Sequence, residues 1–215
     1  MKLRSAAVAA IVLCTALSAQ AAGNLIQNGS FDVGNDVANS YNYGNGFYGS
    51  IPAGASWYFQ NLSGMINTSA SWQVQGALGT VGFLQNHYNF PGRTPAISQS
   101  FFSDDSTLSV SFSLAQRDYG AANAQSVDVL FDGRLLSDIA LTPVGADWTN
   151  YQFTVSGLAA GNHSLSFIGR NSGNSPDATA FIDNVSVSAV PEPATYGMLL
   201  AGAGLLGAVR RRAKK

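Results

Sequence analysis

Alternation of apolar and polar residues is the clearest pattern in the middle of this chain. From Leu108 to Leu114 every second residue is apolar and serines fill the gaps, which predicts a strand with one buried face. The same alternation recurs over Val127–Phe131 and Tyr151–Val155. Asp132-Gly133 is typical of a two-residue hairpin turn and leads into a predicted strand over Arg134–Ile139. Further strands are predicted over Leu25–Ile26, Trp57–Gln60, Ser71–Val74, Gly82–Gln85, Ile97–Phe102, Ser164–Ile168 and Ala180–Ala189.

Helical spacing of apolar residues is missing between the two ends of the chain. Regularly spaced strands with turn residues between them are typical of an antiparallel sandwich. The pattern therefore predicts an all-β fold, with helices expected only in the two terminal segments.

The first 22 residues follow a different pattern. Lys2 and Arg4 precede an apolar run, and Ala19-Gln20-Ala21 forms a small-x-small cleavage motif. This order predicts a helical secretory signal peptide over residues 1–22, which signal peptidase and Sec-type export machinery would process. The one cysteine, Cys14, lies in this segment, so we expect no disulfide and no thiolate site in the mature chain.

The C-terminal segment has three parts in order. Pro191-Glu192-Pro193 comes first, an uncharged run over 194–209 follows, and a basic cluster that includes Arg210, Arg211 and Arg212 comes last. As a helix the 16-residue run would span roughly 24 Å, which is short for a hydrocarbon core of about 30 Å. We therefore predict a single transmembrane helix over 194–209 that anchors the chain transiently. Basic residues stay on the cytoplasmic side, which places the preceding domain outside the cytoplasmic membrane.

This order of features resembles the PEP-CTERM sorting signal of exported bacterial proteins. In that family an exosortase, an integral-membrane cysteine transpeptidase, is thought to process the substrate near the Pro-Glu-Pro motif. Such substrates accompany exopolysaccharide and biofilm systems. The resemblance covers 191–215 and implies that Pro191, Glu192 and Pro193 are recognised by the processing enzyme. A plain membrane anchor or a hydrophobic tail is the alternative interpretation.

Charge separates the middle of the chain from its ends. The whole chain has a formal charge of −1. Between Asn24 and Val190 there are four arginines, eleven aspartates, no lysine and no glutamate, which gives four minus eleven, or −7. A domain of this sign repels nucleic acid and anionic membrane surfaces, so we expect no nucleic-acid partner. Neutral glycans and divalent cations remain open as ligands.

Two short stretches carry a second resemblance. Asn24–Asp32 resembles the opening strand of galactose-binding-like jelly rolls and related carbohydrate-binding modules, and Ala180–Val187 resembles their closing strand. The resemblance implies a two-sheet jelly roll whose first and last strands lie side by side, often with a structural calcium near that pairing. We therefore predict three segments: a signal peptide (1–22), a jelly-roll β-sandwich domain (23–190) and a sorting signal (191–215).

The closing stretch contains an aspartate at a position where an apolar side chain is expected. In a regular strand Phe181, Asp183 and Val185 would share one face, and a carboxylate there is costly unless it is paired or bound to a metal. The resemblance implies a calcium held by Asp183 and by Asp32, where family members often carry Glu. Backbone carbonyls over Asn28–Ser30 would complete the oxygen shell. The alternative is that Asp183 accepts backbone N–H groups or pairs with an arginine.

Glycan binding would require aromatic rings beside polar groups. A Gly- and Asn-rich stretch over 34–54 predicts a long loop that carries Tyr41, Tyr43 and Tyr48, and with Trp57 these form the predicted glycan platform. The other aromatic candidates are Tyr58, Trp72 and Tyr88. For the tryptophans, packing in the core is the alternative.

Signatures of catalysis are missing. The sequence has no Gly-x-Ser-x-Gly elbow, no His-Glu-x-x-His and no phosphate-binding glycine loop. His87 and His163 are the only histidines, and each is predicted to be a surface or loop residue. The sequence favours a non-enzymatic, exported bacterial protein of the cell surface or extracellular matrix, with a structural or adhesive role linked to exopolysaccharide or biofilm. A calcium-stabilised carbohydrate-binding module is the alternative, and an aspartate-dependent glycan hydrolase is a distant third.

Overall fold

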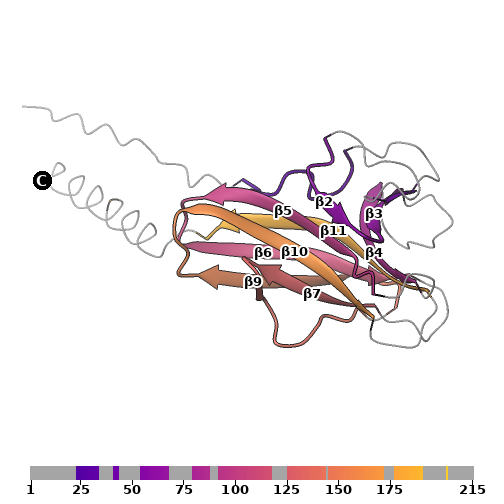
Figure 1. The fold of residues 1–215 in the computed structure, drawn as a ribbon. Coiled ribbons are helices and arrows are strands. Elements are labelled where there is room, and N and C mark those ends of the chain that lie inside the picture. Colours follow the sequence, from indigo (N-terminus) through magenta and orange to yellow (C-terminus); the bar gives the residue numbers. More distant parts are fainter. Residues whose placement is uncertain are drawn as a thin grey trace, which may run out of the picture.

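The structure is a computed structural model that describes residues 23–33, 41–43, 54–67, 79–87, 92–117, 125–143, 145–171, 177–190 and residue 202. The described residues form eleven strands in two sheets that pack face to face (Figure 1). Every pairing between neighbouring strands is antiparallel, which confirms the predicted two-sheet sandwich.

Sheet A contains six strands. In spatial order they are β1 (Tyr41–Tyr43), β3 (Ser63–Asn67), β4 (Thr80–His87), β11 (Asp177–Ala189), β6 (Thr107–Gln116) and β9 (Thr149–Ser156). Sheet B contains five strands. In spatial order they are β2 (Tyr58–Gln60), β5 (Ala96–Ser103), β10 (Gly161–Asn171), β7 (Gln125–Phe131) and β8 (Arg134–Leu135).

The predicted terminal helices fall almost entirely outside the described residues. This applies to the signal segment over 1–22 and to the sorting segment over 191–215, of which only Gly202 is described, in helical conformation. Within the described ranges, no helix is long and apolar enough to cross a membrane.

The main core lies between the two sheets. The apolar residues of β6 that alternate with serines all point inward and are at most 2% exposed. Phe112 of β6 meets Phe167 of β10 edge to face, with ring centroids 5.1 Å apart. This packing fixes the other face of each strand as the outer face, where the serines lie.

The hairpin between β7 and β8 has the predicted turn and a shorter second strand. Asp132 and Gly133 have φ values of 49° and 75°, as a type I′ turn requires. The predicted strand over Arg134–Ile139 is wrong in extent, because β8 pairs with only the last two residues of β7. The chain then leaves the sheet, Ile139 is exposed, and Leu141 returns to bridge Val127.

The N-terminal segment and β11 lie side by side, as the resemblance implied. Leu25 does not form a strand, but its N–H donates to the carbonyl of Val187 over 2.8 Å. The other predicted strands correspond to elements of the structure, except Ser71–Val74, which lies outside the described residues.

A smaller apolar cluster covers part of the outer face of sheet A. Its members are Leu62, Ile66, Val81, Phe83, Ala115 and Phe181, with Trp148 packed against it. Because β3 has apolar contacts on both faces, its residues are buried without alternation. The sequence pattern therefore did not predict β3.

Candidate functional site

The closing strand β11 is not regular. Its register with β6 shifts between Asp183 and Ser186, and Asn184 has a φ of 53°. This bulge reverses the alternation, so Val185 and Val187 lie in the main core while Phe181 and Asp183 face outward from sheet A. The prediction that Asp183 shares a face with Val185 is wrong, because it assumed an unbroken strand.

The bulge places Asp183 near Asp32. Asp183 lies opposite Ser113 of β6, and one of its oxygens accepts the N–H of Asn184 over 2.7 Å. Burial raises the pKa of Asp183 to about 6; the N–H of Asn184 opposes this shift, and the negative charge of Asp32 adds to it. The fold thus brings these two carboxyl groups within electrostatic range of each other.

Asp32 is positioned by the tightly folded N-terminal segment. The ring of Phe31 is fully buried over Gly82, where an added Cβ would lie 2.8 Å from it. Phe31 has a φ of 57°, which turns the next residue outward, and Asp32 then accepts the N–H of Thr80 over 3.3 Å. Gly79 has a φ of 107°, which residues with a side chain rarely adopt, and a Cβ there would also meet the Asp32 carboxylate.

The predicted oxygen shell for calcium is only partly consistent with the hydrogen bonds. The carbonyl of Asn28 accepts from the N–H of Phe31 and from the indole of Trp57, so both of its lone pairs are used. The carbonyl of Gly29 accepts from Val185, and that of Ser30 has no hydrogen-bond partner among the described residues. No group of three or more acidic, histidine or cysteine side chains occurs within the described ranges. These residues thus offer two carboxylates and one free carbonyl, whereas calcium takes six to eight oxygens.

Trp57 does not form part of a glycan platform. Its side chain is 6% exposed, stacks on Phe31 with ring centroids 5.1 Å apart, and donates its indole N–H to Asn28 over 2.9 Å. A ring buried in this way cannot stack on a sugar, so the structure contradicts this prediction and supports core packing. For Tyr41 and Tyr43 only the backbone of β1 is described, and Tyr48 lies outside the described residues. The sorting residues 191–193 and 210–212 also lie outside them.

The outer face of sheet B presents aromatic rings and hydroxyl groups together. A row of paired residues runs across all five strands, through Leu135, Leu130, Ser166, Ser98 and Tyr58. Two further pairs on this face are Ser164 with Ser100 and Asn162 with Phe102. The rings of Tyr58 and Phe102 are 67% and 62% exposed. We call Tyr58, Ser98, Ser100, Phe102, Ser164 and Ser166 the serine face.

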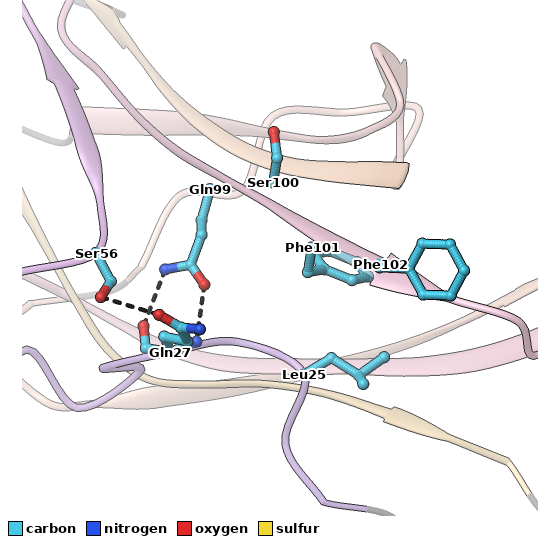
Figure 2. A pocket seen from close by; sticks show the side chains of 7 residues that line it. All are labelled: Leu25, Gln27, Ser56, Gln99, Ser100, Phe101 and Phe102. Atoms are coloured by element: carbon cyan, nitrogen blue, oxygen red, sulfur yellow. Dashed lines mark hydrogen bonds between the residues drawn. The ribbon is translucent and has the colours of Figure 1, made fainter. Parts of the chain in front are cut away.

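A cavity of about 220 Å³ adjoins the serine face at the edge of β5 (Figure 2). It is lined by Leu25, Gln27, Ser56, Gln99, Ser100, Phe101 and Phe102. The Gln99 side chain accepts the backbone N–H of Gln27 over 2.7 Å and donates to its carbonyl over 2.9 Å, as Figure 2 shows. The lining has no charged side chain, and the serine face shares Ser100 and Phe102 with it.

The cavity exists because β2 is short. β2 pairs with β5 only as far as Tyr58 and Ser98, and Ser56 has a φ of 64°, which turns the chain away from β5. The segment of β5 that continues to Phe102 therefore has no strand neighbour on this side among the described residues. On this side the Gln99 side chain bonds the backbone of Gln27 in the N-terminal segment.

Two charged or titratable side chains of β10, Arg170 and His163, have acidic partners. Arg170 of β10 forms an ion pair with Asp128 of β7. His163 is 7% exposed, contacts the rings of Phe101 and Phe131, and lies 2.7 Å from Asp132 and 3.1 Å from the carbonyl of Ala159. The prediction that His163 is a surface or loop residue is wrong, because the inward position in β10 places its ring in the core.

Phe102 was not among the predicted glycan contacts, although the sequence contains a signal for it. Phe101 and Phe102 are consecutive in a predicted strand, and successive side chains of a strand point to opposite faces. One of the two rings must therefore face outward. Tyr58 was in the wider set of aromatic candidates, and the same alternation separates it from the buried Trp57.

Comparison with known proteins gives a sorting motif and a fold. Residues 189–213 match the PEP-CTERM protein-sorting motif, which marks an exported protein whose C-terminal signal is processed by an exosortase. The chain therefore carries a PEP-CTERM sorting signal. Comparison with curated proteins gave no match.

The solved structures with a similar fold include several carbohydrate-binding modules. The chain is 11% identical to TmCBM61, solved in complex with beta-1,4-galactotriose, with a TM-score of 0.50 over 78% of this chain and 99% of that one. It is 11% identical to the CBM22-1 xylan-binding domain of Paenibacillus barcinonensis Xyn10C, with a TM-score of 0.46 over 81% of this chain and 99% of that one. At these identities the likeness establishes the fold alone, which is a jelly-roll sandwich.

Proposed function

We propose that the jelly-roll domain binds a neutral polysaccharide on the serine face of sheet B. The observation that carries this proposal is the pair of exposed rings, Tyr58 and Phe102, beside four serines on the outer face of sheet B. Sugar rings offer C–H faces that pack on aromatic rings, and hydroxyls that exchange hydrogen bonds with serine. The galactotriose-bound module of similar fold is consistent with this class of ligand by analogy.

The dimensions of the face favour a polymer over a single sugar. The serine face lies on β2, β5 and β10, within a sheet of five strands whose width at about 4.8 Å spacing is roughly 19 Å, enough for several sugar units. The adjoining cavity of about 220 Å³ could receive one further group at the edge of β5. The domain's negative charge, and the pairing of Arg170 with Asp128, disfavour uronic acids and other acidic glycans.

Binding of this kind gives an exported protein a structural or adhesive role. The sorting signal directs the chain outside the cytoplasm, and a polysaccharide ligand would hold it at the cell surface or in an exopolysaccharide or biofilm matrix. Hydrolysis is a weaker candidate. A carboxyl group of raised pKa near a second carboxylate suits glycosidases, but Asp183 lies on sheet A, not beside the serine face.

The test is titration of the full-length protein with neutral β-linked polysaccharides and with a uronic-acid polymer as comparison. Tyr58→Ala and Phe102→Ala should each weaken binding about tenfold, which corresponds to about 1.4 kcal/mol. Thr154→Ala on the outer face of sheet A is the control, because Thr154 is also exposed and lies away from the serine face. Failure of the wild type to bind any neutral glycan, or wild-type affinity in both ring variants, would reject the proposal.

We also propose that Asp32 and Asp183 hold a calcium ion that stabilises the junction between the N-terminal segment and β11. A divalent cation would relieve the repulsion between the two carboxylates and would lower the pKa of Asp183. Calcium should raise the melting temperature relative to a chelator, and Asp183→Asn should abolish that difference. Equal melting temperatures of the wild type in calcium and in chelator would exclude the site.

A further inference from the structure

The sorting motif begins inside the folded domain. The match covers 189–213, and Ala189 is the last residue of β11, where it pairs with Leu108 of β6. The N–H of Val190 donates to the carbonyl of Thr107 over 3.0 Å. Pro191 follows directly, so no spacer separates the sheet from the Pro-Glu-Pro motif.

The other edge of this part of β11 is held by Asn24. The side-chain carbonyl of Asn24 accepts the N–H of Val187 over 2.9 Å, and its amide donates to the carbonyl of Val185 over 3.0 Å. The N–H of Leu25 donates to the carbonyl of Val187 over 2.8 Å. We call this set of three hydrogen bonds the Asn24 clamp. Val185 and Val187 are at most 1% exposed, so the clamp holds a strand whose side chains are already fixed in the core.

An enzyme that acts on a peptide segment generally binds it as an extended chain through its backbone N–H and C=O groups. The carbonyl of Val185, the N–H and C=O of Val187 and the N–H of Val190 are all bonded, either within the sheet or by the clamp. Pro191 has no N–H and cannot extend the ladder, so the folded pairing ends immediately before the motif.

We propose that the folded domain limits processing of its own sorting signal. The end of β11 must detach from Thr107 and from the Asn24 clamp before the exosortase-type enzyme can bind the residues on the amino side of Pro191. Opening of a strand end is a local event with a small free energy relative to global unfolding. The strength of the clamp therefore sets how often the motif is accessible, and domain folding and processing compete for the same backbone groups.

The test uses the full-length chain with Asn24→Ala, which removes both side-chain bonds of the clamp. Amide hydrogen exchange at Val187 and Val190 should accelerate at least about tenfold. Conversion of precursor to processed protein in cells, followed by intact mass, should become several-fold faster. Asn150→Ala is the matched control, because Asn150 is an exposed asparagine that bonds Ser113 and does not contact β11 through an observed hydrogen bond.

A second variant tests access of the processing enzyme to the motif without weakening the clamp. Insertion of Gly-Ser-Gly-Ser between Val190 and Pro191 leaves the clamp intact and should also speed processing. In the spacer background, Asn24→Ala should have no further effect on the rate. Unchanged hydrogen exchange in Asn24→Ala would show that the clamp does not hold the end of β11. Faster exchange in Asn24→Ala, with an unchanged rate of processing in both Asn24→Ala and the spacer variant, would refute the proposal that folding limits processing. Neither result depends on whether the serine face binds a glycan.

Discussion

The outer faces of sheet A and sheet B have similar backbones but present different side chains. On sheet A, the part formed by β6, β9 and the end of β11 presents hydroxyl and amide groups and no aromatic ring; we call it the polar face. Its members are Ser109, Ser111, Ser113, Asn150, Gln152, Thr154, Ser186 and Ser188. On sheet B, the serine face adds two exposed aromatic rings to the same kind of serine rows.

Serines that alternate with apolar residues along a strand do not by themselves form a binding site. On the polar face the side chains bond each other, as Ser113 does with Asn150 over 2.7 Å and Gln152 with Ser109 over 3.2 Å. On the serine face, no hydrogen bond between the side chains of Ser98, Ser100, Ser164 and Ser166 is observed. Free hydroxyls beside exposed rings can bind a ligand, whereas mutually bonded polar groups mainly keep a sheet soluble.

The largest effect that we expect is the difference in stability between variants of a buried and of an exposed aromatic residue. Trp57→Ala should destabilise the domain by about 3–5 kcal/mol, because it removes a buried ring and leaves a cavity in the main core. Tyr58→Ala, one residue further along, should change stability by less than about 0.5 kcal/mol while weakening glycan binding. Urea denaturation measures the free energy of unfolding of the two variants. Similar values would contradict the assignment of Trp57 to the core and of Tyr58 to the surface.

A second prediction compares one serine on each face. Ser166→Leu places a bulky side chain in the centre of the serine face and should weaken polysaccharide binding by about tenfold, or about 1.4 kcal/mol. Ser111→Leu makes the same change on the polar face and should leave binding unchanged. Isothermal titration of both variants measures the difference. Equal losses would show that the ligand does not distinguish the two sheets.

A third prediction concerns the carboxyl pair at the edge of the polar face. The folded-state pKa of Asp183 is raised from 3.8 to about 6, so the protonated form is favoured by folding. The stability it contributes is fully present below pH 3.8 and is lost as the pH rises through about 6. In chelator at pH 7, Asp183→Asn should therefore stabilise the domain, by about 1 kcal/mol after allowance for solvent screening.

The measurement is the melting temperature of the wild type and of Asp183→Asn between pH 4 and 8. The gap between the two curves should open as the pH rises. Parallel curves would show that folding does not raise the pKa of Asp183. Thr154→Ala serves as the control that has no titrating group.

The smallest expected effect is that of salt on glycan binding. The serine face has no unpaired charge, since Arg170 is paired with Asp128. Raising the ionic strength from about 0.05 to 0.5 M should therefore change the affinity by less than about twofold, because screening acts only on charges. A loss of tenfold or more would indicate that a charged group binds the ligand.

Much of the sandwich could be predicted because its half-buried strands alternate strictly. β9 and the first half of β6 alternate in exposure from residue to residue, and the sequence pattern predicted which side chains point inward. The prediction failed where a strand does not have one buried and one exposed face, or ends early. β3 is covered on both faces, and β8 leaves the sheet after two residues for reasons of local pairing that alternation does not encode.

The candidate sites depended more strongly on the tertiary structure. Asp32 and Asp183 are far apart in sequence, and only the packing of the N-terminal segment against β11 brings their charges together. The bulge at Asn184 decides which face Asp183 occupies, because one extra residue exchanges inside and outside for the rest of the strand. Trp57 and Tyr58 were both aromatic candidates, and the direction in which β2 begins decided which ring is buried.

The amino-acid sequence is sufficient to identify the sorting signal and the class of fold. The sorting motif is a linear signal that a processing enzyme recognises along the chain, and alternation is a local consequence of burying one face of a strand. Only the tertiary structure decided which aromatic rings face solvent and that the sorting motif starts within a hydrogen-bonded strand. Those properties arise from contacts between residues distant in sequence, such as Asn24 with Val187, which local patterns do not contain.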